Sequence, residues 1–289
     1  MPFLLAVMGA TATGKTGVAE ALAERFDAQL LNADAFQIYR GMDVGTAKPI
    51  RKERYKLLDI RNPDEGFGVG EWVTLAAAEL QTLHKQGRNA IVVGGTGLYI
   101  RALFEGYATM AAPPDPELRA ELERRQADEG LDALAKELQA KVPEVAAKTD
   151  LKNPARVRRA LERLSSGSER LEFQLPNFKR IKVGLDLSKE VLDARISART
   201  GEMVQNGWVQ ELERLRDAGY KPEQPGFRAI GYRNLWTAMA GEIDWSEAIA
   251  TTIAETRRYA KRQRTWLRSE PGLVLVSAER AMEAVSAHL

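Results

Sequence analysis

Short runs of apolar residues, most of them β-branched or bulky, recur along the chain and predict buried strands. They cover residues 3–8, 29–32, 89–93, 181–187 and 273–276. Between them, residues 16–26, 71–86 and 98–105 place apolar side chains three and four positions apart, which predicts amphipathic helices. Because nearly unbroken apolar strands alternate with helices, the pattern predicts an α/β fold with a parallel sheet and helices on both faces.

Two long stretches contain no strand pattern and read as helical insertions on this core. The first opens at Pro113 and Pro114, a cluster that interrupts regular structure, and closes at the serines near 165–168. The predicted organisation is a core segment 1–112, a helical insertion 113–176, a core strand and helix 177–200, a lid-like helical insertion 201–254, and a core helix, strand and helix 255–289. The alternative is that both stretches are ordinary long crossovers packed on the sheet. By analogy with kinase lids, 201–254 is expected to be the mobile one.

The first predicted strand leads into the pattern G-x-x-x-x-G-K-[ST], followed by a helix. Its residues are Gly9, Ala10, Thr11, Ala12, Thr13, Gly14, Lys15 and Thr16. In such a loop the backbone N–H groups point inward around a phosphate, and the N-terminus of the helix adds its dipole. Lys15 supplies positive charge to the distal phosphate, and the Thr16 hydroxyl is a ligand for Mg²⁺. The sequence therefore predicts a phosphate-loop (P-loop) NTPase-like fold that binds a phosphate chain.

The third predicted strand lacks the acidic residue that nucleotide hydrolases place there to hold the metal. It ends in Gly94-Gly95-Thr96, and this glycine cluster lacks the third glycine of a dinucleotide-binding fingerprint. A carboxylate follows the second strand instead, at Asp34. By analogy with phosphate-loop kinases, Asp34 is expected to approach the phosphate site; an aspartate after a strand is also common as a helix cap, so both interpretations remain open.

Composition narrows the possible chemistry. Of 289 residues, 44% are apolar and 28% are charged, which excludes a disordered or fibrous chain. The sequence has no cysteine and only two histidines, so it excludes disulfides, cysteine-bound zinc and thiol nucleophiles, and it disfavours a histidine metal site. The apolar start of the chain is shorter than the roughly 20 residues that span a bilayer and lacks the features of a signal peptide. A soluble, cytoplasmic protein without membrane contact is expected.

Basic residues cluster locally although the net charge is only +2. Residues 257–268 hold six basic side chains and no acid, together with Tyr259 and Trp266. Residues 152–163 add five basic side chains against Glu162 alone, and 228–233 add a smaller cluster with Tyr232 available for stacking. Charge runs are usually solvated faces, but several of them, mixed with aromatic residues and next to a phosphate loop, favour RNA binding.

Together these motifs resemble the tRNA dimethylallyltransferase family, also called tRNA isopentenyltransferase. The resemblance is carried by residues 9–16, 32–49, 94–101, 228–233 and 256–268, which span nearly the whole chain. The run 41–49 is particularly specific, because no general physical role demands that series.

The resemblance implies transfer of a dimethylallyl group from dimethylallyl diphosphate to N6 of the adenosine just 3′ of the tRNA anticodon, with Mg²⁺. It implies that the phosphate loop holds the prenyl diphosphate, that Asp34 is the general base and that Thr96 contacts the reacting centre. It also implies contacts with the anticodon stem-loop. These residues are Asp34, Ala35, Phe36, Gln37, Arg119, Ala155, Arg156, Val157, Arg158, Arg159, Arg228, Ala229, Ile230, Gly231, Tyr232, Arg233, Lys261, Arg262, Gln263, Arg264, Thr265, Trp266, Leu267 and Arg268.

One position departs from the family pattern: Ala35 stands where relatives often carry serine, which removes a hydrogen bond near the adenine. A monomer is expected. Two other hypotheses about the function remain open from the sequence alone. One is a small-molecule or nucleoside kinase whose loop holds ATP and which needs no RNA surface. The other is an RNA-binding protein without enzyme activity, which the retained glycines, Lys15 and Thr16 disfavour.

Overall fold

The computed structural model describes residues 1–106, 116–165 and 175–289. The chain divides into two compact units, one made of residues 1–106 and 174–289 and the other of residues 107–173. The chain-breaking prolines 113 and 114 and the serines 166 and 168 lie outside the described residues. Each unit is presented by itself.

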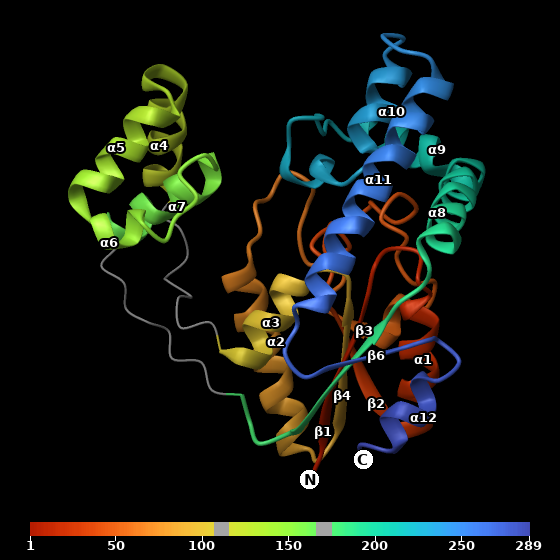
Figure 1. The fold of residues 1–289 in the computed structure, drawn as a ribbon. Helices are drawn as coiled ribbons and strands as arrows, with labels where there is room; N and C mark the ends of the chain where they lie inside the picture. The colour runs from red at the N-terminus through yellow and green to blue at the C-terminus, as the bar shows by residue number, and fades with distance from the viewer. Residues whose placement is uncertain (107–115, 166–174) are drawn as a thin grey trace. The chain divides into compact units, whose positions relative to one another are not determined.

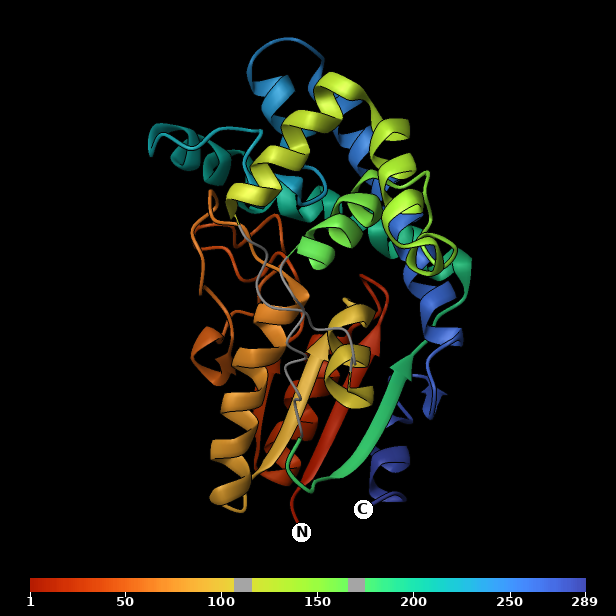
Figure 2. The same ribbon diagram turned by 90° about the vertical axis from the view of Figure 1, so that its left-hand side faces the viewer.

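The first unit is built on a six-stranded sheet with the strand order β3-β2-β4-β1-β5-β6. Every pairing is parallel, and Figure 2 shows the larger strands as arrows that point the same way. The predicted α/β fold with a parallel sheet is therefore confirmed. The strands are β1 (Phe3–Gly9), β2 (Ala28–Asn32), β3 (Tyr55–Lys56), β4 (Asn89–Gly94), β5 (Lys179–Leu185) and β6 (Leu273–Val276).

The structure corrects the strand prediction at two places. Strand β3 was missed, because two residues are too short to display a period; it forms only by pairing Tyr55 with Leu30 of β2. Strand β5 was predicted at 181–187 but starts and ends two residues earlier. Its start is polar yet pairs with β1, from Lys179 opposite Phe3 onward. Its end is set at Asp186, whose carboxylate accepts a hydrogen bond from the N–H of Leu187.

Helices cover both faces of the sheet (Figure 1). On one face α1 (Lys15–Phe26) packs on β1 and β4, and the C-terminal α12 (Ala281–Ser286) packs on β5 and β6. On the other face lie α2 (Val69–Lys85) and α3 (Gly97–Glu105). Trp72 of α2 and Tyr99 of α3 stack there with ring centroids 4.9 Å apart. The central strands β1 and β4 are buried almost throughout, which explains why the sequence shows unbroken apolar runs there instead of alternation.

The segment 201–254 belongs to the first unit and is helical. Its core contains Trp208, Phe227 and Tyr232, and the loop around Met42 after β2 packs against it. Helix α11 runs from this layer back to the sheet (Figure 1), so residues near its C-terminal end lie beside the ends of β1 and β4. The elements of this part are α8 (Lys189–Met203), a helical turn η2 (Val204–Trp208), α9 (Val209–Asp217), η3 (Pro225–Arg228), α10 (Tyr232–Met239) and α11 (Trp245–Arg268), and a short turn η1 (Lys52–Arg54) precedes β3.

The described part of the second unit consists of α4 (Pro116–Glu129), α5 (Leu131–Lys141), α6 (Pro143–Ala146) and α7 (Pro154–Ser165). Leu122, Leu134 and Leu138 form its small core together with Val157 and Leu161. This unit is thus helical, with its own apolar centre. Among the helices of the described ranges, none has the length and apolarity needed to cross a membrane.

Candidate active site

The phosphate loop is preformed by its own backbone and by one threonine. Ala12 and Gly14 have φ angles of 63° and 87°, which turn the chain so that α1 begins immediately after the loop. The Thr13 hydroxyl donates a hydrogen bond of 2.8 Å to the carbonyl oxygen of Ala10. A Cβ on Gly9 would lie 2.6 Å from the oxygen of that hydroxyl, so the turn requires glycine there. The loop therefore needs little rearrangement to surround a phosphate.

Lys15 borders a cavity of about 420 Å³ beside this loop, with Thr16 and Asp34 in its wall. Burial lowers the pKa of the Lys15 ammonium to about 8, the nearby Asp34 carboxylate opposes that change and Arg199 adds to it. The cost of holding these cations close together falls when an anion enters the cavity. The arrangement fits a ligand with several negative charges.

Arg199 of α8 is a second cation at the loop, and the sequence analysis missed it. Its Nη1 donates a hydrogen bond of 3.2 Å to the Thr11 hydroxyl oxygen. Burial lowers the pKa of its guanidinium, although the Asp34 and Glu202 carboxylates oppose the change. Nothing in the local pattern distinguishes this arginine from any other on an amphipathic helix. Only the packing of α8 beside the loop identifies it.

Asp34 sits in a tight turn directly after β2. Its backbone N–H donates to Asn32 Oδ1 at 3.1 Å, and its own Oδ1 accepts from the N–H of Phe36 at 2.9 Å. The N–H of Ala35 donates to the Thr96 hydroxyl oxygen at 3.2 Å. Asp34 thus stabilises a turn, but no helix begins there, so the helix-cap interpretation is wrong. The same turn brings Asp34 to the Lys15 cavity. The structure places Lys15, Asp34 and Thr96 together.

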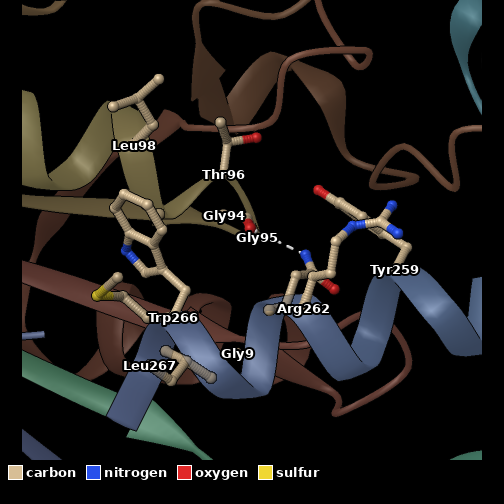
Figure 3. Close-up of a pocket in the computed structure, with 12 residues that line it drawn as sticks. Gly9, Gly94, Gly95, Thr96, Leu98, Tyr259, Arg262, Trp266 and Leu267 are labelled. Atoms are coloured by element: carbon tan, nitrogen blue, oxygen red, sulfur yellow. Dashed lines mark hydrogen bonds between the residues drawn. The ribbon is translucent and has the colours of Figure 1, made fainter. Parts of the chain in front are cut away.

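A second cavity, of about 190 Å³, lies on the Thr96 side and is lined largely by apolar and aromatic groups. Figure 3 shows Thr96 above Gly95, with Tyr259, Arg262 and Trp266 of α11 around them. Tyr259 borders both this cavity and the Lys15 cavity. Burial raises the pKa of its hydroxyl, and the Asp34 charge raises it further. Tyr259 is a neutral, amphipathic group between a charged cavity and an apolar one.

A third cavity, of about 260 Å³, joins Asp34 and Phe36 to the residues predicted to bind RNA on α11 and in the 228–233 cluster. Arg228, Ile230 and Arg262 line it together with Asp34. Residues about two hundred positions apart in the chain therefore form one wall. The structure brings this part of the predicted RNA surface to the proposed base.

The basic segment on α11 is divided between an exposed and an inward side. Its exposed residues are Arg257, Arg258, Lys261, Arg262, Thr265 and Arg268. Gln263 and Leu267 are buried, and Arg264 forms a 3.0 Å ion pair with Asp186. Trp266 packs so closely on the turn after β4 that a Cβ on Gly97 would be 2.2 Å from its indole nitrogen. Half of this segment therefore serves internal packing.

The 228–233 cluster shows a similar division. Arg228 and Arg233 are exposed, Ile230 is half-buried, and Ala229 and Gly231 are buried. Tyr232, which the sequence offered for stacking on a base, is fully buried, and its hydroxyl donates a 2.6 Å hydrogen bond to Glu211. It cannot stack on an RNA base in this arrangement. Its role is to hold Glu211.

Glu211 explains the specific run 41–49 that the sequence left without a physical role. The buried carboxylate accepts hydrogen bonds from three successive backbone N–H groups, those of Asp43 at 2.6 Å, Val44 at 2.7 Å and Gly45 at 3.2 Å. A Cβ on Gly45 would be 2.0 Å from the indole nitrogen of Trp208. The run therefore forms a loop that fits tightly against α9 and α10.

Within that loop, Lys48 is buried and donates hydrogen bonds to the carbonyl of Tyr39 at 2.5 Å and to Asp43 at 2.9 Å. Gln37 donates to the carbonyl oxygens of Thr46 and Ala47 at 3.1 and 3.0 Å. Since Thr46 and Ala47 line the Lys15 cavity, the loop forms part of the site wall.

The predicted RNA-binding residues of the second unit gather on α4 and α7. Arg119 and Arg159 each form a 2.9 Å ion pair with Glu162, and Arg158 donates to Gln126 at 2.6 Å. Burial alone would raise the pKa of Glu162, but hydrogen bonds from the two arginines lower it. The three remaining residues differ in exposure: Ala155 and Arg156 are exposed and Val157 is buried.

The donor set beside the loop fits Mg²⁺ better than a transition metal. Thr16 places a hard hydroxyl oxygen on the wall of the Lys15 cavity. Across residues 1–106, 116–165 and 175–289, no group of three histidine, cysteine or acidic side chains could hold a metal by itself. Mg²⁺ commonly uses one or two protein oxygens, waters and the oxygens of a substrate phosphate, so this donor set suits it.

Comparisons with known proteins agree with the geometry. A family model described as IPP transferase matches residues 37–270, and one described as isopentenyl transferase matches residues 2–67. The chain is 39% identical over 273 residues to the tRNA dimethylallyltransferase of Thermomicrobium roseum, covering 92% of this chain and 83% of that protein. It is also 39% identical over 279 residues to the enzyme of that name from Gloeobacter violaceus, covering 94% and 91%.

Solved structures give the same result. The crystal structure of a full-length tRNA isopentenylpyrophosphate transferase from Bacillus halodurans matches 100% of this chain and 97% of its own, with a TM-score of 0.73 and 33% identity. A eukaryotic dimethylallyltransferase studied while acting on tRNA has a TM-score of 0.80, covering 99% of this chain and 78% of that one. At 21% identity this second likeness concerns the fold.

Proposed function

The chain belongs to the IPP transferase family of tRNA dimethylallyltransferases, and from this premise we propose how its own residues perform the reaction. The enzyme transfers a dimethylallyl group from dimethylallyl diphosphate to N6 of the adenosine 3′ of the anticodon in tRNA. One observation carries the residue assignments: Lys15, Asp34 and Thr96 converge at the carboxyl ends of neighbouring parallel strands, around connected loops. Sites in open α/β sheets form at this edge.

The phosphate loop binds the diphosphate and stabilises it as the leaving group. An allylic carbon becomes reactive when negative charge on the departing diphosphate is stabilised. The loop N–H groups, Lys15 and Arg199 are arranged for that task before any ligand arrives, which is the condition for strong electrostatic catalysis. The loop holds the diphosphate of the prenyl donor, and this diphosphate is the leaving group. No phosphoryl group is transferred, in contrast to the reaction of a kinase.

Asp34 takes the proton. The amino nitrogen becomes cationic as its bond to the allylic carbon forms, and it must then lose a proton. Asp34 borders the Lys15 cavity and also the cavity that Arg228 and Arg262 line. The carboxylate is therefore within the space that the donor and the acceptor must share. Thr96 holds the turn through the N–H of Ala35 and lines the apolar cavity beside it, where it contacts the reacting centre.

Mg²⁺ would be held by the Thr16 hydroxyl together with oxygens of the diphosphate, and it would supply further positive charge to the leaving group. The group that the protein would contribute to this metal site is the Thr16 hydroxyl on the wall of the Lys15 cavity. Lys15 and Arg199 remain the charges that the chain itself provides.

The RNA approaches over the exposed basic residues of α11 and of the 228–233 cluster. Arg228, Arg262 and Phe36 line one cavity with Asp34, so a base that enters it reaches the carboxylate. A base stacked in an anticodon loop hides its amino group, and it must be flipped out to react. Single-stranded loops allow this at low cost. The protein acts as a monomer in the cytoplasm, where its tRNA substrate is found.

The test is label transfer from radiolabelled dimethylallyl diphosphate to an unmodified anticodon stem-loop. Transfer to N6, dependent on Mg²⁺, is the expected result. ADP release from ATP with a small acceptor would instead indicate a kinase. Tight tRNA binding without turnover would indicate an RNA-binding protein, and either result would refute the proposal.

A further inference from the structure

Gln263 of α11 connects the phosphate loop with the turn that precedes Thr96. Its Oε1 accepts a hydrogen bond of 2.9 Å from the N–H of Thr11 in the phosphate loop. Its Nε2 donates one of 2.9 Å to the carbonyl oxygen of Gly95, the dashed line in Figure 3. The residue is only 7% exposed. Both ends of one amide are thus committed to backbone groups on different loops.

The bridge depends on close contact between α11 and the turn after β4. A Cβ on Gly95 would lie 2.3 Å from Gln263 Nε2, so a larger residue there would displace the amide. One turn further along α11, Trp266 makes a similarly close contact with Gly97, and the Arg101 guanidinium lies 4.0 Å from the centre of its ring. The helix is therefore held in a fixed register on this turn.

A buried ion-pair network fixes the end of the same helix. Glu270, just after α11, pairs with Arg101 of α3 at 2.8 Å and with Lys182 of β5 at 2.8 Å. Glu270 and Lys182 are both buried. Because α11 is anchored at this end, the Gln263 amide cannot easily shift when one of the two loops moves. The amide can therefore fix the positions of the phosphate loop and of the turn at Gly95.

The two bridged loops carry different substrates. Thr11 belongs to the loop that binds the leaving diphosphate, and Gly95 precedes Thr96, whose hydroxyl accepts from Ala35 and so supports the Asp34 turn. Transfer requires the allylic carbon and the acceptor nitrogen to meet at about 3–3.5 Å, and a 1 Å misplacement can cost roughly a hundredfold in rate. We propose that Gln263 is a positioning residue that sets the separation between the phosphate loop and the Thr96 turn. This inference rests on the proposed function.

This assignment differs from the role as a tRNA contact that the family resemblance implies for residues 261–268. Lys261 and Arg262 are exposed and can reach a phosphate, whereas the Gln263 amide is buried and bonded on both sides. Loss of Gln263 should therefore lower the rate of transfer with both substrates bound. Loss of Lys261 should weaken tRNA binding.

Gln263→Glu gives the sharpest test. A glutamate carboxylate still accepts from the Thr11 N–H but has no hydrogen to donate to the Gly95 carbonyl. We expect the single-turnover rate at saturating donor and tRNA to fall about 10- to 100-fold, with the Kd for tRNA within about threefold of wild type. Burial and the facing Gly95 carbonyl oxygen disfavour the charged carboxylate and raise its pKa above the ordinary value of about 4.3, and the protonated acid regains a donor. The ratio of variant rate to wild-type rate should therefore rise as the pH is lowered from 8 to 6, which a general loss of fold would not produce.

Gln263→Met removes both hydrogen bonds and should lower the transfer rate without recovery at low pH. Lys261→Met on the same helix is the matched control, and it should weaken tRNA binding, measured as a higher Kd. Variants at Gln263 that transfer within about twofold of wild type at saturation, or that change only the Kd for tRNA, would overturn the positioning role. If the wild-type protein transfers no label, the proposed function itself fails, so the two failures are distinct.

Discussion

Replacing Glu211 should destabilise the protein and slow transfer together, because one buried carboxylate holds the loop 41–49. The carboxylate accepts four hydrogen bonds, three from backbone N–H groups and one from the Tyr232 hydroxyl. Tyr232 loses its acceptor as well, and burial beside Glu211 already raises the pKa of its hydroxyl far above the ordinary value. In Glu211→Ala the buried Tyr232 hydroxyl and the three half-buried N–H groups lose their acceptor.

The size of the effect follows from those contacts. A buried donor left unsatisfied costs about 1–3 kcal/mol, and part of that cost is recovered where water enters the space left by the side chain. We therefore expect a loss of about 3–5 kcal/mol for Glu211→Ala. Glu211→Gln keeps the shape and one acceptor oxygen but presents an N–H₂ group toward the Gly45 N–H, so we expect about 1–2 kcal/mol. In a chain of this size 1 kcal/mol lowers Tm by about 2–4 °C.

Calorimetric Tm and urea unfolding provide the measurement, and Glu213→Ala is the matched control. Glu213 is the same residue type on the same helix and is half-buried, and its side chain makes no hydrogen bond or ion pair with residues in the described parts of the chain. Because Thr46 and Ala47 line the Lys15 cavity, the Glu211 variants should also lose about tenfold in single-turnover rate. A Glu211→Ala protein that unfolds within about 1 kcal/mol of the Glu213→Ala protein would refute the argument.

Four further predictions concern the proposed reaction. Lys15→Ala should reduce transfer by at least about a hundredfold while the Kd for tRNA stays near wild type, as expected for one leaving-group donor; a change of only a few-fold in single-turnover rate would remove the loop from the mechanism. The Lys15 ammonium is the form that binds the diphosphate, and its pKa is lowered to about 8. Affinity for dimethylallyl diphosphate should therefore be complete below pH 8 and decline by up to about tenfold per pH unit above it. A calorimetric profile of Kd against pH that is no steeper than that of Lys15→Ala would contradict this. Asp34→Asn should lower the single-turnover rate by about 10² to 10⁴ with donor binding retained, and near-normal transfer at saturating tRNA would exclude Asp34 as the base. Neutralising the exposed Lys261 and Arg268 should weaken tRNA binding and reduce the slope of log affinity against log salt by up to about 0.9 per lost phosphate contact, and an unchanged slope would show that these residues do not meet the RNA.

The sequence by itself determined the features that depend on neighbours along the chain. The phosphate loop follows from the spacing of Gly9, Gly14 and Lys15, and the parallel sheet follows from short apolar runs between amphipathic helices. Local periodicity is sufficient for these, because strand, loop and helix are adjacent. It was insufficient for β3, whose two residues form a strand only by pairing with β2.

Tertiary structure decided which side chains meet at the site and which face inward. Gln263 reaches a phosphate-loop N–H across 252 positions, Arg199 reaches Thr11 across 188, and Glu211 reaches Asp43 across 168. No periodic pattern encodes contacts of that separation, since each residue occupies an ordinary helical position. The basic cluster on α11 illustrates the limit: composition marked residues 257–268 as one surface, but helix packing buries Gln263 and Leu267 and leaves Lys261 and Arg262 exposed. A helix presents its residues in several directions, and only the elements packed around it determine which of them reach the solvent.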